Sequence, residues 1–183
     1  MPDLPAGAEE RPRLFFALWP DAATAAALDA CARRLHRQCG GRPMRRDTLH
    51  LTLAFLGEQP VGRVDELKTL AASLAGEPFD FVLSRAGSFQ RNRVVWGGPE
   101  VTPPALVRLA QELGGALRAR GFPVESRPFS AHVTLVRNAR QAPPAQLEPA
   151  VCWRVASFAL MRSRLSAEGA LYEALGRWPL SSQ

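Results

Sequence analysis

The sequence predicts an α+β fold of two pseudo-symmetric lobes, each an antiparallel-rich sheet with helices on its outer face, with an active-site cleft between them. The main observation is a phrase that occurs twice, because His-Leu-Thr-Leu at 50–53 returns as His-Val-Thr-Leu at 132–135. A helix-like stretch precedes each copy at the same distance, since Asp21 stands 29 residues before His50 and Pro103 stands 29 residues before His132. An internal duplication of this kind predicts two related lobes.

The first half of the chain alternates strand and helix signals. "RLFFALWP" is typical of a short buried strand, and Asp21 is a good N-cap for the alanine-rich helix that stops at Gly40 and Gly41. "TLHLTLAFLG" has the density of β-branched and apolar residues expected of a strand, and the apolar spacing after it predicts a second helix. The predicted elements are strand 13–20, helix 21–39, strand 48–57 and helix 61–76.

The second half repeats the scheme with more strands. "FDFVLSRAGSF" and "RVVWGG" predict two strands joined by a turn at "QRN", and the next helix has prolines in its first turn and Gly121 beyond its end. Three more stretches predict strands. The elements are strands 79–89 and 93–98, helix 103–121, and strands 129–137, 153–165 and 171–180.

Composition favours an ordinary globular domain. The chain has 183 residues, 46% of them hydrophobic, and a net charge of +6 that comes almost entirely from arginine. We expect a disordered leader at 1–12, a single bilobal domain at 13–183, and a monomer. Three cysteines without a C-x-x-C pair predict a cytoplasmic protein without disulfides, and the short apolar runs exclude a membrane-spanning segment.

The alternation of side chains along a strand determines which residues of the repeated phrase share a face. Side chains alternate between the faces of a strand, so His50 and Thr52 lie on one face while their aliphatic neighbours lie on the other. The same parity puts His132 and Thr134 on one face. If the lobes are related by a two-fold axis, two imidazoles and two hydroxyls surround one ligand.

This set of side chains suits phosphoryl chemistry. Imidazole has an unperturbed pKa of about 6.5, so one ring can accept a proton while the other donates one. Threonine hydroxyls can donate hydrogen bonds to phosphate oxygens. A 2',3'-cyclic phosphate carries its own leaving oxygen, so attack by water needs an acid, a base and phosphate-binding groups, without a metal or cofactor.

The motifs resemble those of the two-histidine phosphoesterase superfamily. "RLFFAL", "LHLTLAFLGE" and "RPFSAHVTLVR", which ends in an arginine, are similar to the RNA 2',3'-cyclic phosphodiesterase group, also called 2'-5' RNA ligase-like, from about Arg13 to "YEALGRWPL". The resemblance implies that His50 donates a proton to the departing ribose oxygen and that His132 activates water. It also implies that Thr52 and Thr134 hold the phosphate, that the product is a 2'-phosphate, and that no metal is needed.

Two departures from the group's pattern concern the flanks of the motifs. Ala131 stands where a proline often precedes the second histidine, and "GRPMRRDTLH" lacks the aromatic residue that often lies upstream of the first motif. The predicted partners are RNA ends or nucleotides that carry a 2',3'-cyclic phosphate. Alternatives are a basic RNA-binding module without turnover, and ligation of a cyclic phosphate to a 5'-hydroxyl end.

Other chemistry is disfavoured by the residues near the motifs. Zinc needs three or four ligands, and no third ligand stands at suitable spacing, so no metal site is predicted. Ser130 shares a face with His132, but no carboxylate stands nearby to orient the ring, which argues against a triad. His36, at the end of the first helix, is expected to face solvent or to lie near the negative end of the helix dipole, and not to be a metal ligand.

Further substrate-binding candidates flank the motifs. Arg127 and Arg137 can bind phosphate through their guanidinium forks, with a structural salt bridge as the alternative for Arg137. Phe16 and Trp19 can stack on a base, although core packing suits Phe16 better. The other tryptophans are predicted to be core residues: Trp96, Trp153 and Trp178.

Overall fold

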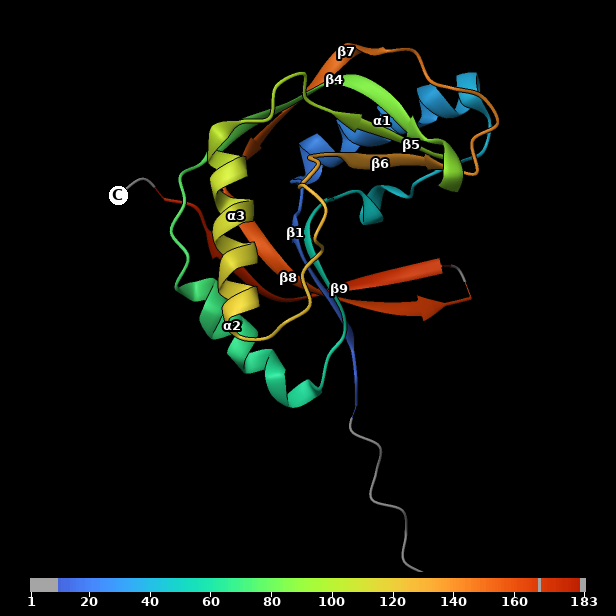
Figure 1. Ribbon diagram of the computed structural model, residues 1–183. Coiled ribbons are helices and arrows are strands. Elements are labelled where there is room, and N and C mark those ends of the chain that lie inside the picture. The colour runs from blue at the N-terminus through green and yellow to red at the C-terminus, as the bar shows by residue number, and fades with distance from the viewer. Residues whose placement is uncertain (1–9, 168, 182–183) are drawn as a thin grey trace, which may run out of the picture.

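The computed structural model describes residues 10–167 and 169–181 and has an α+β architecture (Figure 1). In this part of the chain nine strands form one sheet in which every registered pair is antiparallel, in the order β7, β4, β5, β6, β3, β1, β8, β9, with β2 paired to β6. The strands are β1 (Arg13–Leu18), β2 (Arg42–Pro43), β3 (Leu51–Glu58), β4 (Phe79–Phe89), β5 (Val94–Gly98), β6 (Val133–Arg137), β7 (Gln146–Val155), β8 (Ser157–Ser166) and β9 (Gly169–Pro179).

Three α-helices pack on this sheet in the described part of the chain, and their ends follow ordinary capping chemistry. Helix α1 (Ala22–Cys39) begins where the Asp21 carboxylate accepts the Thr24 N–H at 2.7 Å, and it ends at Gly40, whose φ of 69° suits glycine. Helix α2 (Val64–Ala72) is shorter than predicted because 61–63 form a 3₁₀ turn. Helix α3 (Pro104–Ala119) buries four leucines, each worth about 1.5–3 kcal/mol: Leu106, Leu109, Leu113 and Leu117.

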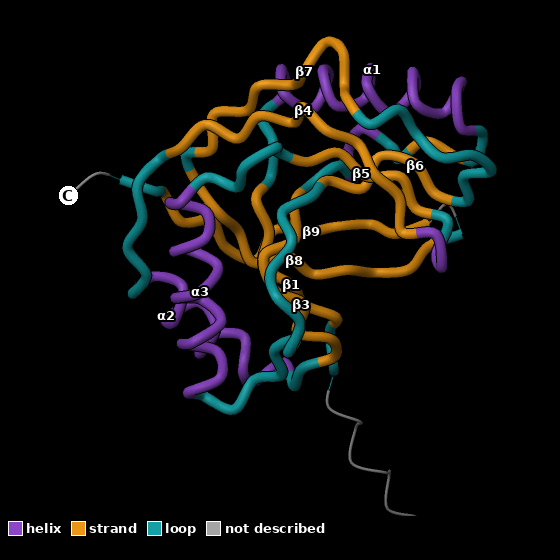
Figure 2. The backbone as a smooth tube through the Cα atoms, turned by 45° about the horizontal axis from the view of Figure 1, so that its top comes forward, coloured by secondary structure: helices purple, strands orange, loops and turns teal. Residues whose placement is uncertain are grey.

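The sheet divides into two halves. We call β1, β3, β8 and β9 the His50 half-sheet, and β2, β4, β5, β6 and β7 the His132 half-sheet. Helices α2 and α3 pack on each other and against β9 and β3, whereas α1 packs against β6 and β7. Figure 2 shows these two groups of helices on separate parts of the molecule. The helix from the first half of the sequence therefore covers the strand that carries the second motif, and the lobes are not simply the two halves of the chain.

A single registered pair joins the two half-sheets. Leu51 at the start of β3 pairs with Val133 at the start of β6, and both side chains are fully buried. Each of these residues directly follows a histidine of the repeated phrase. The pair that joins the half-sheets therefore consists of equivalent residues of the two motifs, so the motifs run antiparallel to each other across it.

Several predicted boundaries need correction. The stretch predicted as one strand over 153–165 is divided at Ala156 into β7 and β8, and β7 begins earlier, at Gln146. Of the leader predicted over 1–12, residues 1–9 lie outside the described residues, but Glu10 and Pro12 are ordered. Their carbonyls accept hydrogen bonds from the backbone N–H groups of Val61 and Gln59, each at 3.0 Å.

Candidate active site

The register at the joint brings the two motifs together on one face of the sheet. Extending the Leu51 and Val133 pair by one residue each way sets His50 opposite Thr134, and Thr52 opposite His132. The two histidines are then diagonal neighbours, which in an antiparallel pair are separated by about 7–8 Å, with their Cβ atoms somewhat closer. Two imidazoles at that spacing can both reach one phosphate, as the parity of the repeated phrase predicts.

Backbone carbonyls hold both rings in the same way. Nδ1 of His50 lies 2.7 Å from the Thr48 carbonyl oxygen, and Nδ1 of His132 lies 2.9 Å from the Ser130 carbonyl oxygen. A carbonyl only accepts, so Nδ1 carries the hydrogen in each ring and Nε2 is left for chemistry. Nε2 of His50 lies 3.1 Å from Oγ1 of Thr52, the polar partner on the same strand face.

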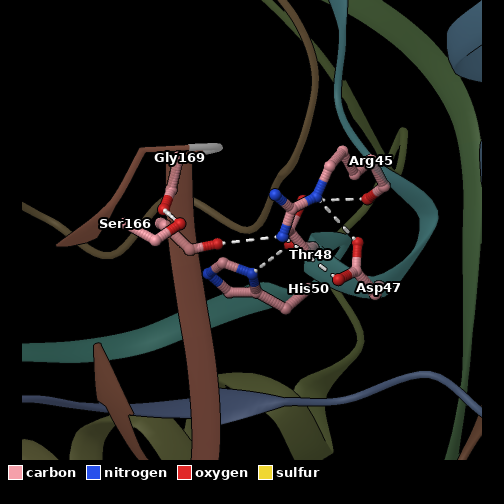
Figure 3. A network of polar contacts seen from close by, with 7 residues as sticks. Arg45, Asp47, Thr48, His50, Ser166 and Gly169 are labelled. Carbon is pink, nitrogen blue, oxygen red and sulfur yellow. Dashed lines mark hydrogen bonds and ion pairs between the residues drawn. The ribbon is translucent and has the colours of Figure 1, made fainter. Parts of the chain in front are cut away.

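A short polar network fixes the loop before His50 (Figure 3). The Thr48 hydroxyl donates to the Arg45 carbonyl at 2.8 Å, and the Arg45 guanidinium binds both carboxylate oxygens of Asp47 at 3.1 Å. The same guanidinium donates to the Ala170 carbonyl at 3.0 Å, which ties the loop to β9. The carbonyl that orients His50 is thus anchored to the opposite edge of its half-sheet.

Aromatic rings enclose His50. Trp19 stacks on the imidazole with centroids 5.1 Å apart and planes 3° apart, Phe15 lies at 5.1 Å, and the edge of Tyr172 lies at 5.3 Å. Burial against these rings lowers the pKa of His50 from 6.5 to about 4, and the charges of Arg137 and His132 act in the same direction. Near neutral pH the free protein therefore holds His50 as the neutral ring.

His132 lies in a more open setting. The edge of Phe89 contacts its ring at 5.1 Å and Trp96 lies at 6.4 Å, both from strands of the His132 half-sheet. Trp96 pairs with Thr134 in the sheet, and its ring lies over Gly87, where a Cβ would meet the indole at 2.2 Å. Each histidine therefore has aromatic walls, and those of His50 enclose it more tightly.

The arginine candidates differ in position. Arg137 ends β6 with an exposed side chain, and its charge lowers the pKa of both His50 and Tyr172, which places it near the first ring. The salt bridge considered for Arg137 is not formed with any carboxylate in 10–167 and 169–181. Arg127 is exposed in the loop before β6, where it pairs with Glu125.

The prediction that Phe16 binds substrate is wrong. Its side chain is 0% exposed and packs against Phe158 and Trp178 in the core. The neighbouring Phe15 points to the histidine face instead, because successive residues of β1 alternate between the faces. The expectation of core packing for Phe16 is confirmed.

Some residues of the site could not be found from the sequence. Tyr172 and Phe89 had no motif around them, and Trp96, a predicted core residue, is only half-buried beside His132. Trp153 is in the core as predicted. The alternation of side chains in "RLFFAL" puts Phe15 and Phe16 on opposite faces, but the sequence does not show which face carries the histidines.

The described part of the chain contains neither a metal-ligand cluster nor a membrane-spanning helix. No three or more His, Cys, Asp or Glu side chains in 10–167 and 169–181 group closely enough to hold a metal ion. No helix there has the length and apolar character required to cross a bilayer. All three cysteines are free thiols, two buried and one exposed: Cys31, Cys39 and Cys152.

The fold and this pair of histidine motifs are those of the two-histidine phosphoesterases. A family model described as "LigT like Phosphoesterase" matches residues 18–96 and 98–172, one motif in each segment. The chain belongs to this LigT-like phosphoesterase family, which confirms the resemblance seen in the motifs.

Relatives and solved structures agree with this assignment. The chain is 38% identical over 146 residues to the RNA 2',3'-cyclic phosphodiesterase of Escherichia coli (strain K12), covering 77% of this chain and 81% of the relative. It is 31% identical over 184 residues to the protein of that name from Thermus thermophilus, covering 93% and 91%. The crystal structure of E. coli LigT complexed with 3'-AMP matches with a TM-score of 0.87 at 33% identity, covering 94% of this chain and 100% of that one.

Proposed function

We propose that this protein is an RNA 2',3'-cyclic phosphodiesterase that opens the cyclic phosphate at RNA ends, or on nucleotides, to a 2'-phosphate. The observation that carries the proposal is the joint between β3 and β6, where two histidines, each held through Nδ1 by a backbone carbonyl, and two threonines share one face. The names of the relatives support the same activity. The substrate is cyclic-phosphate RNA or nucleotide.

His132 acts as the base in this proposal. Its Nδ1–H donates to the Ser130 carbonyl, so the neutral ring has a lone pair on Nε2 that accepts a proton from water. The water oxygen forms a bond to phosphorus while the bond from phosphorus to the ribose 3' oxygen breaks. Thr52 and Thr134 donate hydrogen bonds to the non-bridging oxygens, and Arg137 adds a positive charge. Arg127 is proposed to contact the substrate farther from phosphorus.

His50 acts as the acid and must gain a proton when the substrate binds. Raising its pKa from about 4 to 7 requires roughly 4 kcal/mol of added stabilisation. A phosphate charge about 4 Å away supplies about 4 kcal/mol at an effective dielectric constant near 20. The charge of the bound phosphate is therefore large enough to keep Nε2 of His50 protonated near neutral pH. Nε2 then donates this proton to the departing 3' oxygen.

We further propose that the chain from 13 onward works as one bilobal domain, as a cytoplasmic monomer that needs no metal or cofactor. The three free thiols and the RNA substrate support the location. The chemistry is complete within one chain, because both histidines and both threonines come from it.

The proposal is tested with chelator-treated protein and a 2',3'-cyclic nucleotide. We expect turnover to continue in excess EDTA and the sole product to be the 2'-phosphate, identified by ³¹P NMR or chromatography against both isomers. Added Mg²⁺ or Zn²⁺ should raise the rate less than twofold. Loss of turnover on chelation, restored by a metal, would contradict the metal-free mechanism, and a 3'-phosphate product would contradict departure of the 3' oxygen.

A further inference from the structure

A second feature of the His50 half-sheet is a hollow of about 460 Å³ beside the first residue of β1 and the last residues of β8. Residues 10–13, which lead into β1, line one side of it, and residues 162–165 of β8 line the other. The two segments meet where Arg13 pairs with Ser163. Four of the lining side chains are arginines and one is a carboxylate, Glu10: the arginines are Arg11, Arg13, Arg162 and Arg164. We call this feature the arginine hollow.

Two of the four arginines have an acidic partner, and two have none among the described residues. Arg162 pairs with Glu10, and Arg164 lies 3.5 Å from the Glu173 carboxylate. Arg11 and Arg13 are exposed and have no ion-pair partner within residues 10–167 and 169–181. A hollow with a surplus of positive charge attracts anions, and guanidinium groups match phosphate oxygens in geometry.

The arginine hollow is connected to the active site through one row of the sheet. Arg13 on β1 pairs with Ser163 on β8, which pairs with Tyr172 on β9, so these three side chains lie on the same face. The ring of Tyr172 contacts His50 at a centroid distance of 5.3 Å. Burial raises the pKa of the Tyr172 phenol, while the charge of Arg13 lowers it, so the Arg13 guanidinium acts on the ring that contacts His50.

We propose that the arginine hollow binds backbone phosphates of an RNA strand on the 5' side of its terminal cyclic phosphate. The inference deepens the proposed function and rests on it. In that mechanism His50 protonates the departing 3' oxygen, so the terminal ribose lies on the His50 side of the phosphorus. The strand that precedes this ribose then continues past Tyr172 toward Arg13, and its phosphates reach the arginine hollow.

This site distinguishes an RNA end from a cyclic mononucleotide, which has no upstream phosphate. We therefore expect a higher kcat/KM for a ten-nucleotide RNA with a 2',3'-cyclic end than for a 2',3'-cyclic mononucleotide. Each phosphate contact on a single strand contributes about 0.7 to the slope of log affinity against log salt concentration. The preference for RNA should consequently weaken as the salt concentration rises.

The test is a charge reversal at the two arginines of the arginine hollow that have no acidic partner among the described residues, Arg11→Glu with Arg13→Glu, measured on both substrates. We expect the ratio of kcat/KM for RNA to kcat/KM for the mononucleotide to fall at least tenfold, and the salt slope for RNA to flatten. The matched control reverses two exposed arginines on helices α1 and α3, Arg37→Glu with Arg118→Glu, and has the same net charge. This control should keep the ratio within twofold, and thermal melts should confirm that both variants fold.

The outcomes separate the two proposals. If the parent protein turns over the mononucleotide and the reversal leaves the ratio unchanged, the arginine hollow does not bind RNA and the inference is wrong. The inference is equally wrong if the control lowers the ratio as much as the reversal does, because overall charge then accounts for the preference. Absence of turnover on either substrate would instead contradict the proposed function.

Discussion

Replacing His50 or His132 by glutamine is expected to lower kcat for a 2',3'-cyclic nucleotide by about 10²–10⁴-fold, the usual range for loss of a general acid or base. Each ring supplies a proton transfer in the same displacement, so neither loss is compensated by the other ring. The double variant should be little worse than the more impaired single variant, because residues that act as a unit are not additive. Steady-state assays with saturating substrate measure both effects.

The chain contains its own matched control. His36, the third histidine, lies in the last turn of α1, which packs on β6 and β7. His36→Gln should keep kcat within twofold of the parent. If either motif variant retains more than a tenth of the parent's kcat while its melting temperature is unchanged, that histidine does not perform acid or base catalysis.

A sulfur substitution in the substrate distinguishes the acid from the base. When the 3' bridging oxygen is replaced by sulfur, the departing group is a thiolate, which leaves without a proton because a thiol has a pKa of about 8.5. His50→Gln should then lose less than tenfold on the sulfur substrate, although it loses about 10²–10⁴-fold on the oxygen substrate. His132→Gln should be impaired on both, since water must still be deprotonated.

The opposite pattern would reassign the roles. If the sulfur substrate rescues His132→Gln and not His50→Gln, then His50 is the base, and its lowered pKa in the free protein would suit that role directly. The ribose would then lie on the His132 side, and the arginine hollow would no longer lie along the upstream strand. Product release as free thiol, followed with a thiol reagent, measures the rate for each variant.

Much of the fold can be predicted from local sequence patterns. The N-cap at Asp21, the glycines after α1 and the prolines at the start of α3 mark helix ends that depend on neighbouring residues only. The ends of α2 and the division between β7 and β8 do not follow from local patterns, because a 3₁₀ turn and a one-residue break at Ala156 leave little trace in composition. The exchange of helices between the half-sheets is set by long-range pairing, which no local pattern encodes.

The site was predictable to the extent that strand parity governs it. Parity put His50 with Thr52 and His132 with Thr134, and the register between Leu51 and Val133 agrees with a common face. The aromatic walls were not predictable, since Tyr172 reaches His50 across β8 and β1 from the other end of the chain. The low pKa of His50 results from burial against those aromatic rings, so it could not be predicted from the sequence either.

The proposed mechanism requires both imidazoles to act on a single phosphate, and a crystal structure with bound phosphate or vanadate would show whether they can. We expect one anion with an oxygen within hydrogen-bond distance of Nε2 of His50 and another oxygen equally near Nε2 of His132, with the hydroxyls of Thr52 and Thr134 donating to it. An anion held by only one of the rings, or two anions on separate surfaces, would refute the paired-histidine mechanism.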